Sequence, residues 1–166
     1  MKRFLKLFFG GLLIVLILIQ FYPRSNNNIS RKIPLSDIST AHQVPAPVRQ
    51  ILKTSCYDCH SNNTVYPWYA ATQPVSLLLA DHIKDGKAEL NFSEFGTYSL
   101  RRQYRKLEEI GEQVKEGEMP LTSYSIIHTN AKLSLNQQLV LSNWTVALRD
   151  SFRTCYPADS LERKKR

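Results

Sequence analysis

The chain has 166 residues, of which 43% are apolar, and a formal net charge of +8. This length is typical of a single domain with one modest core. Most of the positive charge is terminal. Residues 1–32 hold six bases and no acid, residues 163–166 hold four bases, and residues 33–162 hold 12 bases against 14 acids. A nucleic-acid-binding domain carries its basic stripe on the folded part, so this pattern argues against nucleic acid as a partner.

Residues 1–22 predict an N-terminal transmembrane helix that anchors the protein. Lys2, Arg3 and Lys6 precede an apolar run over residues 7–22. A helix over that run spans about 24 Å, slightly short of the hydrocarbon core of a bilayer. Positive charge before the run holds that end in the cytoplasm. The rest of the chain is then expected on the periplasmic or outer side of a bacterial cytoplasmic membrane, as a single-pass protein.

A cleaved signal peptide is the alternative for this segment. Cleavage requires small residues in an Ala-x-Ala-like pattern after the apolar run. The run ends instead in Gln-Phe-Tyr-Pro-Arg at residues 20–24, which favours an uncleaved anchor.

A linker and two helices are predicted before residue 90. Residues 23–45 contain several prolines and asparagines and no sustained apolar period, so they predict a linker. A helix is expected over residues 47–54, where apolar side chains recur at i, i+3 and i+4 and lead into a pair of cysteines. A second is expected over residues 75–84, opened by a proline and stopped at Gly86.

Two longer helices complete the predicted domain. Residues 97–116 form the clearest one, stopped at Gly117, with inner residues at spacings of three and four: Leu100, Tyr104, Leu107, Ile110 and Val114. The last is expected from Ser134, with Gln137 completing a capping box, to about Phe152. Its predicted inner stripe is Val140, Trp144, Ala147 and Leu148.

These elements predict an all-α fold. We expect a helical domain of about four helices over residues 46–154, followed by a basic tail over residues 155–166. Long loops in so small a domain need something to pack on, and a large prosthetic group would supply it.

The stretch Cys56-Tyr-Asp-Cys59-His60 carries the chemistry of this sequence. Two thiols separated by two residues lie on one side of a helical turn, and each can add to one vinyl group of a porphyrin. The adjacent histidine can place an imidazole on the iron, which is the Cys-x-x-Cys-His attachment pattern of haem c. The predicted helical domain is therefore cytochrome c-like, with about four helices around one covalent haem. A redox-active Cys-x-x-Cys pair usually lies in a βαβ unit, and a zinc site usually has a second pair of ligands at similar spacing. The sequence predicts neither.

Met119 is the leading candidate for the sixth iron ligand. It is the only methionine besides the initiator, and it precedes Pro120 between two predicted helices. A Met–His axial pair raises the reduction potential. His128 is the first rival, His82 is the second, and His42 is expected to be solvated within the linker.

Several blocks agree, in order, with a known family. The chain resembles the small bacterial haem-binding domain that often follows an N-terminal membrane anchor. The resemblance spans about residues 40–150 and rests on Cys56-Tyr-Asp-Cys-His-Ser-Asn-Asn-Thr, Tyr66-Pro-Trp-Tyr, Pro74-Val-Ser, His82-Ile, Leu90-Asn-Phe-Ser, Gly117-Glu-Met-Pro-Leu and Leu133-Ser. It implies a c-type haem domain outside the cytoplasmic membrane, with Met119 in the family's Gly-x-Met-Pro block. Leu77 stands where relatives often have an aromatic residue, and Cys155 lies outside the resemblance.

The leading functional hypothesis is electron transfer by a haem carrier that is not itself an enzyme, with the membrane and redox partner proteins as its partners. The alternative is a peroxidase-like haem enzyme or gas sensor with an open sixth iron position. A third hypothesis is a haem-bearing structural or assembly subunit of a larger complex. No nucleophile–base–acid spacing points to another catalytic class.

Overall fold

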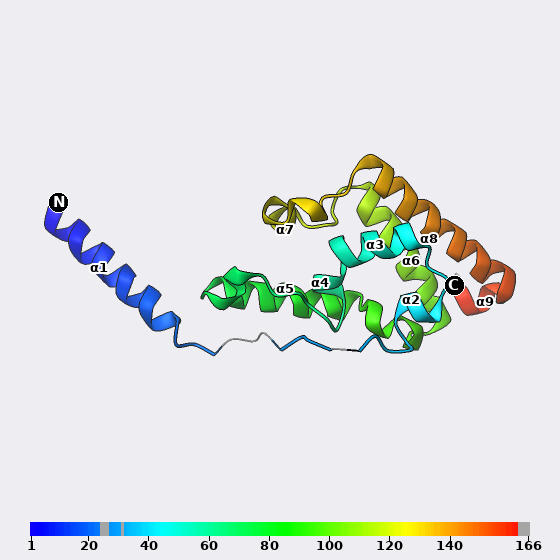
Figure 1. The fold of residues 1–166 in the computed structure, drawn as a ribbon, viewed down its shortest axis with the longest axis horizontal. Coiled ribbons are helices and arrows are strands. Elements are labelled where there is room, and N and C mark those ends of the chain that lie inside the picture. The colour runs from blue at the N-terminus through cyan, green and yellow to red at the C-terminus, as the bar shows by residue number, and fades with distance from the viewer. Residues whose placement is uncertain (24–26, 31, 163–166) are drawn as a thin grey trace.

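The computed structural model describes residues 1–23, 27–30 and 32–162 (Figure 1). Within these ranges the chain is helical, and the only β-type pairing is one isolated bridge between Ile29 and Asn63. The all-α prediction is therefore confirmed. The α-helices are α1 (Lys2–Ile19), α2 (Ile38–Ala41), α3 (Ala46–Ser55), α4 (Tyr57–His60), α5 (Val75–Glu89), α6 (Leu100–Lys115), α7 (Thr122–Ile127), α8 (Leu135–Cys155) and α9 (Ala158–Leu161). Three short 3₁₀ helices are η1 (Trp68–Ala71), η2 (Phe92–Thr97) and η3 (Thr129–Ala131).

The prediction of an N-terminal transmembrane helix is wrong, and so is the single-pass location derived from it. In the described part of the chain, no helix is long and apolar enough to cross a membrane. Helix α1 has 18 residues and includes three bases in its first five positions. The uncharged remainder, residues 7–19, spans about 20 Å as a helix, against a hydrocarbon core of about 30 Å. Figure 1 shows α1 standing apart from the other helices.

Helices α6 and α8 pack against each other and carry most of the core. Four of the five inner residues predicted for α6 are buried, and Leu100 is partly buried. On α8 the buried stripe lies about one residue away from the prediction, because Ala147 is exposed. Its buried members are Leu141, Trp144, Thr145 and Phe152.

The predicted start of α8 and the predicted end of α6 are confirmed by their caps, whereas α6 begins only at Leu100 and α8 continues to Cys155. The Ser134 hydroxyl accepts from the Gln137 amide N–H, and the Gln137 side chain accepts in return from the Ser134 amide N–H. This capping box starts α8. After α6, Gly117 has a φ of +77°, a left-handed conformation that favours glycine and turns the chain out of the helix.

The second half of the predicted linker belongs to the packed domain. Ile38 and Val44 are core residues, and Asp37 is 1% exposed. The Asp37 carboxylate caps α2 at the Ser39 amide N–H and also accepts the Tyr57 hydroxyl at 3.0 Å. His42, expected to be solvated, is partly buried and hydrogen-bonded to Gln103. Residues 37–44 therefore help to position the cysteine motif, through the hydrogen bond from Tyr57 to Asp37.

Substitution of Asp37 tests whether this segment is structural. We expect Asp37→Ala to lower the free energy of unfolding by about 2 kcal/mol, because a helix cap and a buried acceptor are lost together. Denaturant unfolding measures the change. Leu35→Ala is the matched control, since Leu35 is 86% exposed. Equal stabilities of the two variants would show that residues 37–44 act only as a tether.

Candidate functional site

The cysteine motif forms one tight helical turn between α3 and α5. Helix α3 ends at Ser55, and the amides of Cys59 and His60 both donate to the Cys56 carbonyl, at 3.2 and 3.0 Å. This turn places Cys56 and Cys59 three residues apart on one side of α4. Both thiols are free and partly buried. Burial raises the pKa of Cys56 to about 12 and that of Cys59 to about 11, so both thiols are protonated at neutral pH.

Gly86 allows α4 to lie directly against α5. The sequence predicts that Gly86 ends this helix, but α5 continues to Glu89. A methyl group at position 86 would come within 2.9 Å of the Cys59 carbonyl oxygen, closer than carbon side chains approach backbone. The glycine is therefore required by the contact between helices and not by the end of one.

His60 is oriented by the carboxyl end of α5. Its Nδ1 lies 3.0 Å from the Leu90 carbonyl oxygen. A carbonyl only accepts, so Nδ1 carries the proton and Nε2 presents a lone pair. Burial lowers the pKa of His60, and the imidazole is therefore neutral at neutral pH. The ring edge also meets Phe92, with centroids 6.3 Å apart. A partly buried, neutral imidazole with one fixed nitrogen is the arrangement typical of a metal-binding histidine.

Two adjoining cavities open beside the motif, with volumes of about 230 and 330 Å³. Together they reach the size usual for cofactor pockets, roughly 300–1,000 Å³. The smaller cavity extends along α5 to α7, and the larger one extends to α6, where Ile110 and Val114 form an apolar wall. Both cavities are lined by Ser55, Cys56, His60, Glu89, Met119 and Pro120.

Met119 is far from the cysteine motif in the sequence, but it lines the same two cavities as Cys56 and His60. Its amide N–H donates to the Gln113 carbonyl at 3.1 Å, which holds the loop after α6. Its side chain is partly buried and packs against the core. The fold thus brings Cys56, His60 and Met119 to the same cavities, while Cys59 lines the smaller one.

A family model supplies the family of this chain. The model of a haem-binding domain matches residues 14–147. The chain belongs to the haem-binding domain family. It is therefore a haem-binding protein, as the resemblance of its sequence blocks predicted. No curated protein and no solved structure was found to match the chain.

The two rival histidines of the haem-binding domain differ in their surroundings. His82 is exposed and lies on the lining of the smaller cavity. His128 lines neither cavity. Its Nε2 is 2.6 Å from the Tyr69 hydroxyl, and its ring stacks on Tyr124 at a centroid distance of 4.3 Å. Within the described residues, no three His, Cys, Asp or Glu side chains are grouped so as to hold a metal ion by themselves.

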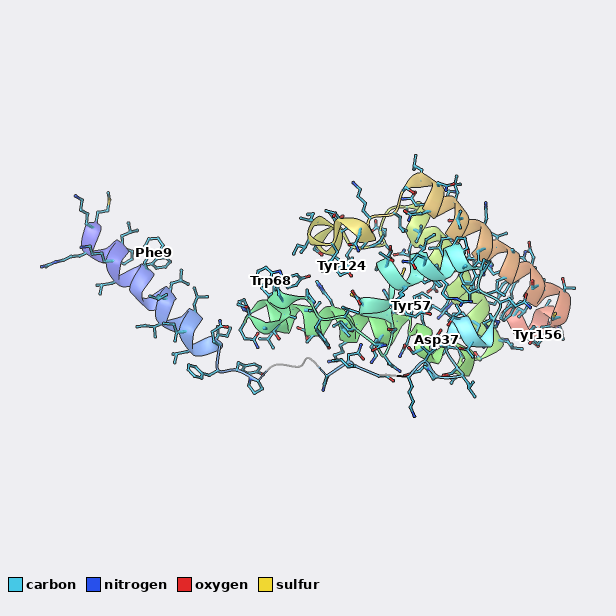
Figure 2. All side chains as sticks on the ribbon, in the orientation of Figure 1. Phe9, Asp37, Tyr57, Trp68, Tyr124 and Tyr156 are labelled. Atoms are coloured by element: carbon cyan, nitrogen blue, oxygen red, sulfur yellow. The ribbon has the colours of Figure 1, made fainter. Side chains whose placement is uncertain are left out.

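Asp58, between the two cysteines, has a role that the sequence did not reveal. One carboxylate oxygen accepts the Val65 amide at 3.0 Å, and the other accepts the Tyr124 hydroxyl at 2.7 Å. Burial, followed by the nearby carboxylate, raises the pKa of Tyr124, so its hydroxyl keeps the proton. Helix α7 has no buried residue of its own. The bond from Tyr124 therefore ties α7 to the motif across the smaller cavity, on the left of the domain in Figure 2.

Charged side chains also line these two cavities. Lys106 of α6 is almost fully buried in the wall of the larger one. Its ammonium group pairs with Glu109 at 2.5 Å and with Glu89 at 3.3 Å. Asp58 and Asp85 line the smaller cavity. Lys106 is the single lysine or arginine among the described residues lining these two cavities, and the two glutamates that pair with it already match its charge.

Gly86→Ala tests the contact between α4 and α5. Helix propensity alone predicts that alanine stabilises α5 by roughly 1 kcal/mol. We expect the opposite sign, a loss of about 1–3 kcal/mol, because the new methyl group displaces the Cys59 backbone. The haem bound per mole of protein should fall as well.

Denaturant unfolding and haem absorbance measure these two effects. Gly10→Ala serves as the control, since a methyl group at Gly10 would meet nothing within 4 Å. A Gly86→Ala protein that is more stable than wild type and fully loaded with haem would contradict this account of the site.

Proposed function

We propose that the chain carries one haem c, attached through Cys56 and Cys59, and that it transfers electrons. The observation that carries the proposal is the shared lining of the cavities: a free thiol, an oriented imidazole and a thioether all line them. The residues present fit haem. Both thiols are free for attachment, His60 offers Nε2, and the walls at Ile110 and Val114 are apolar.

The proposed covalent attachment is an addition reaction between the thiols and the haem, with no other reactant. Each thiol adds across one vinyl group, so that an S–H bond and a C=C π bond are replaced by a C–S and a C–H bond. No electrons are gained or lost in this addition. The protonated state of Cys56 and Cys59 is compatible with it, because the proton moves to the vinyl carbon.

His60 and Met119 are the proposed axial ligands. When bound, haem supplies a one-electron couple between ferrous and ferric iron. The Leu90 carbonyl orients His60 and increases the basicity of its Nε2. The soft thioether of Met119 favours the ferrous state and raises the potential. If both side chains bound the iron, no position on it would be left for a substrate, and the protein would act as a carrier and not as an enzyme.

A redox partner protein is the proposed physiological partner. Exposed apolar side chains gather at the end of the domain where η1 and α7 lie: Trp68 is 86% exposed, Ile126 70% and Ile127 60%. Figure 2 shows Trp68 and Tyr124 at this end. Patches of this kind mark sites of protein interaction. A partner that docks here would lie close to the smaller haem cavity, which Tyr124 lines.

Counting thiols tests covalent attachment. The chain has three cysteines, none in a disulfide. If Cys56 and Cys59 both form thioethers, the unfolded holoprotein should show one reactive thiol, that of Cys155, and without attachment it should show three. Cys155→Ala should reduce the count to zero and leave haem bound.

Cysteine variants complete this test. In Cys56→Ala/Cys59→Ala, acidified organic solvent should extract all the haem. Each single variant should keep one thioether and shift the reduced pyridine haemochrome band to longer wavelength. Haem that resists extraction from the double variant would refute covalent attachment through this motif.

Met119→Ala tests the sixth ligand. Haem should remain attached, the thioether-to-iron charge-transfer band should disappear, and the potential should fall by on the order of 100 mV. Absorption spectra and redox titration measure both changes. His82→Ala and His128→Ala should keep the band, because the His82 side chain is exposed to solvent and the His128 ring is hydrogen-bonded to Tyr69.

Other outcomes identify other sites. A wild-type spectrum in Met119→Ala, with a high-spin spectrum in one histidine variant, would establish bis-histidine ligation. A wild type that is already high-spin and binds carbon monoxide rapidly would establish an open sixth position, and with it a peroxidase-like enzyme or gas sensor.

A further inference from the structure

A third cavity, of about 600 Å³, lies between α6, α8 and α9, away from the haem site. Figure 1 shows α9 beside the end of α8, at the opposite end of the domain from α7. Two buried residues, Tyr104 and Leu161, lie in its lining, and each is 3% exposed. Around them, five arginines from α6 and α8 line the cavity: Arg101, Arg102, Arg105, Arg149 and Arg153.

Within the described chain, three buried hydrogen-bond donors on residues of this cavity have no partner. They are Nε of Arg102, Nε of Arg149 and the hydroxyl of Tyr104. Only two other buried side-chain polar atoms in the described chain lack a hydrogen-bond partner, Oε1 of Gln73 and Oγ of Ser76, and neither residue lines this cavity. Buried polar atoms without partners are costly, and three of the five belong to residues that line this one cavity. An oxygen-rich guest would satisfy them together.

Two arginines of α8, Arg149 and Arg153, stack against the ring of Tyr104. The Arg149 guanidinium lies 4.4 Å from the Tyr104 centroid and the Arg153 guanidinium 5.5 Å. Arg149 also pairs with Glu108 at 2.7 Å. Arginine stacked on an aromatic ring presents its N–H groups edge-on, in a fork that matches the oxygens of a carboxylate or phosphate.

The charge of the cavity favours an anion. Its lining holds five arginines against Glu108 and Glu162. Arg105 pairs with Glu109 at 3.1 Å, and Arg153 pairs with Asp150 at 3.1 Å. These pairs are exposed, and exposed ion pairs are weak, so an anion can compete for the arginines. The first turn of α6 contains no acid.

We propose that this cavity is a binding site for a small oxyanion, a phosphate or a carboxylate, held by Arg102, Arg149 and Tyr104. The anion would accept from the Nε atoms of the two arginines and from the tyrosine hydroxyl. The site uses none of the residues that line the haem cavities, so it stands whether or not haem is attached as proposed above.

Calorimetric titration of the full-length holoprotein tests the site. Inorganic phosphate, pyrophosphate and citrate are the probes, in a low-salt buffer free of other oxyanions, with chloride as the comparison anion. We expect one saturable site per chain for at least one oxyanion and none for chloride. Saturation by phosphate or pyrophosphate alone would identify a phosphate site, and saturation by citrate alone a carboxylate site.

Two conservative variants connect binding to the named donors. Arg149→Lys keeps the charge and the Glu108 pairing but loses Nε and the planar fork, and should weaken binding about tenfold. Tyr104→Phe removes only the hydroxyl. Without the anion it should be at least as stable as wild type, because an unpartnered buried group is gone, and it should bind the anion more weakly. Arg49→Gln, outside the cavity, is the control.

The proposal fails under either of two results. One is the absence of saturable binding of any of the three oxyanions to the wild-type protein. The other is binding that Arg149→Lys and Tyr104→Phe leave unchanged, or that Arg49→Gln weakens as much as they do, because the anion would then be held by surface charge in general.

Discussion

The backbone of α4 can lie against α5 because residue 86 has no side chain. A methyl group there would sit 2.9 Å from the Cys59 carbonyl oxygen. This close approach brings His60 to the carboxyl end of α5, where the Leu90 carbonyl accepts from Nδ1 and leaves Nε2 as the nitrogen with the lone pair. The orientation of the imidazole, the direction of the two thiols and the shape of the adjoining cavities all depend on this one contact between helices.

The sequence predicts well what is determined locally. The spacing of apolar residues in α6, the capping box at Ser134 and the left-handed turn at Gly117 depend on neighbours within four residues, and each is found where the pattern indicates. Gly86 shows the limit of this reasoning. Glycine is a local signal for the end of a helix, but here α4, from another part of the chain, requires it.

The two errors near the N-terminus have separate physical causes. Residues 34–44 have no apolar period, so their sequence does not predict burial. Asp37 is buried there because its carboxylate accepts a hydrogen bond from Tyr57, twenty residues further along the chain. No local pattern can reveal such a contact. In the first segment, the apolar run of the sequence extends to Tyr22, whereas α1 ends at Ile19 and includes the early bases. The shorter uncharged helix falls below a bilayer's thickness.

Helix α6 lines two chemically different cavities. Lys106, Ile110 and Gln113 lie on one face of the helix and line the larger cavity beside the cysteine motif. Arg102 lies one turn before Lys106 on the same face, but it lines the arginine-rich cavity together with Arg105. Its guanidinium also reaches the last turn of α5, where it donates to the Ala88 and Glu89 carbonyls at 3.4 Å. The next carbonyl along, that of Leu90, holds His60. The end of α5 therefore accepts hydrogen bonds from an arginine of one cavity and from an imidazole of another, so its backbone is the physical link between the two.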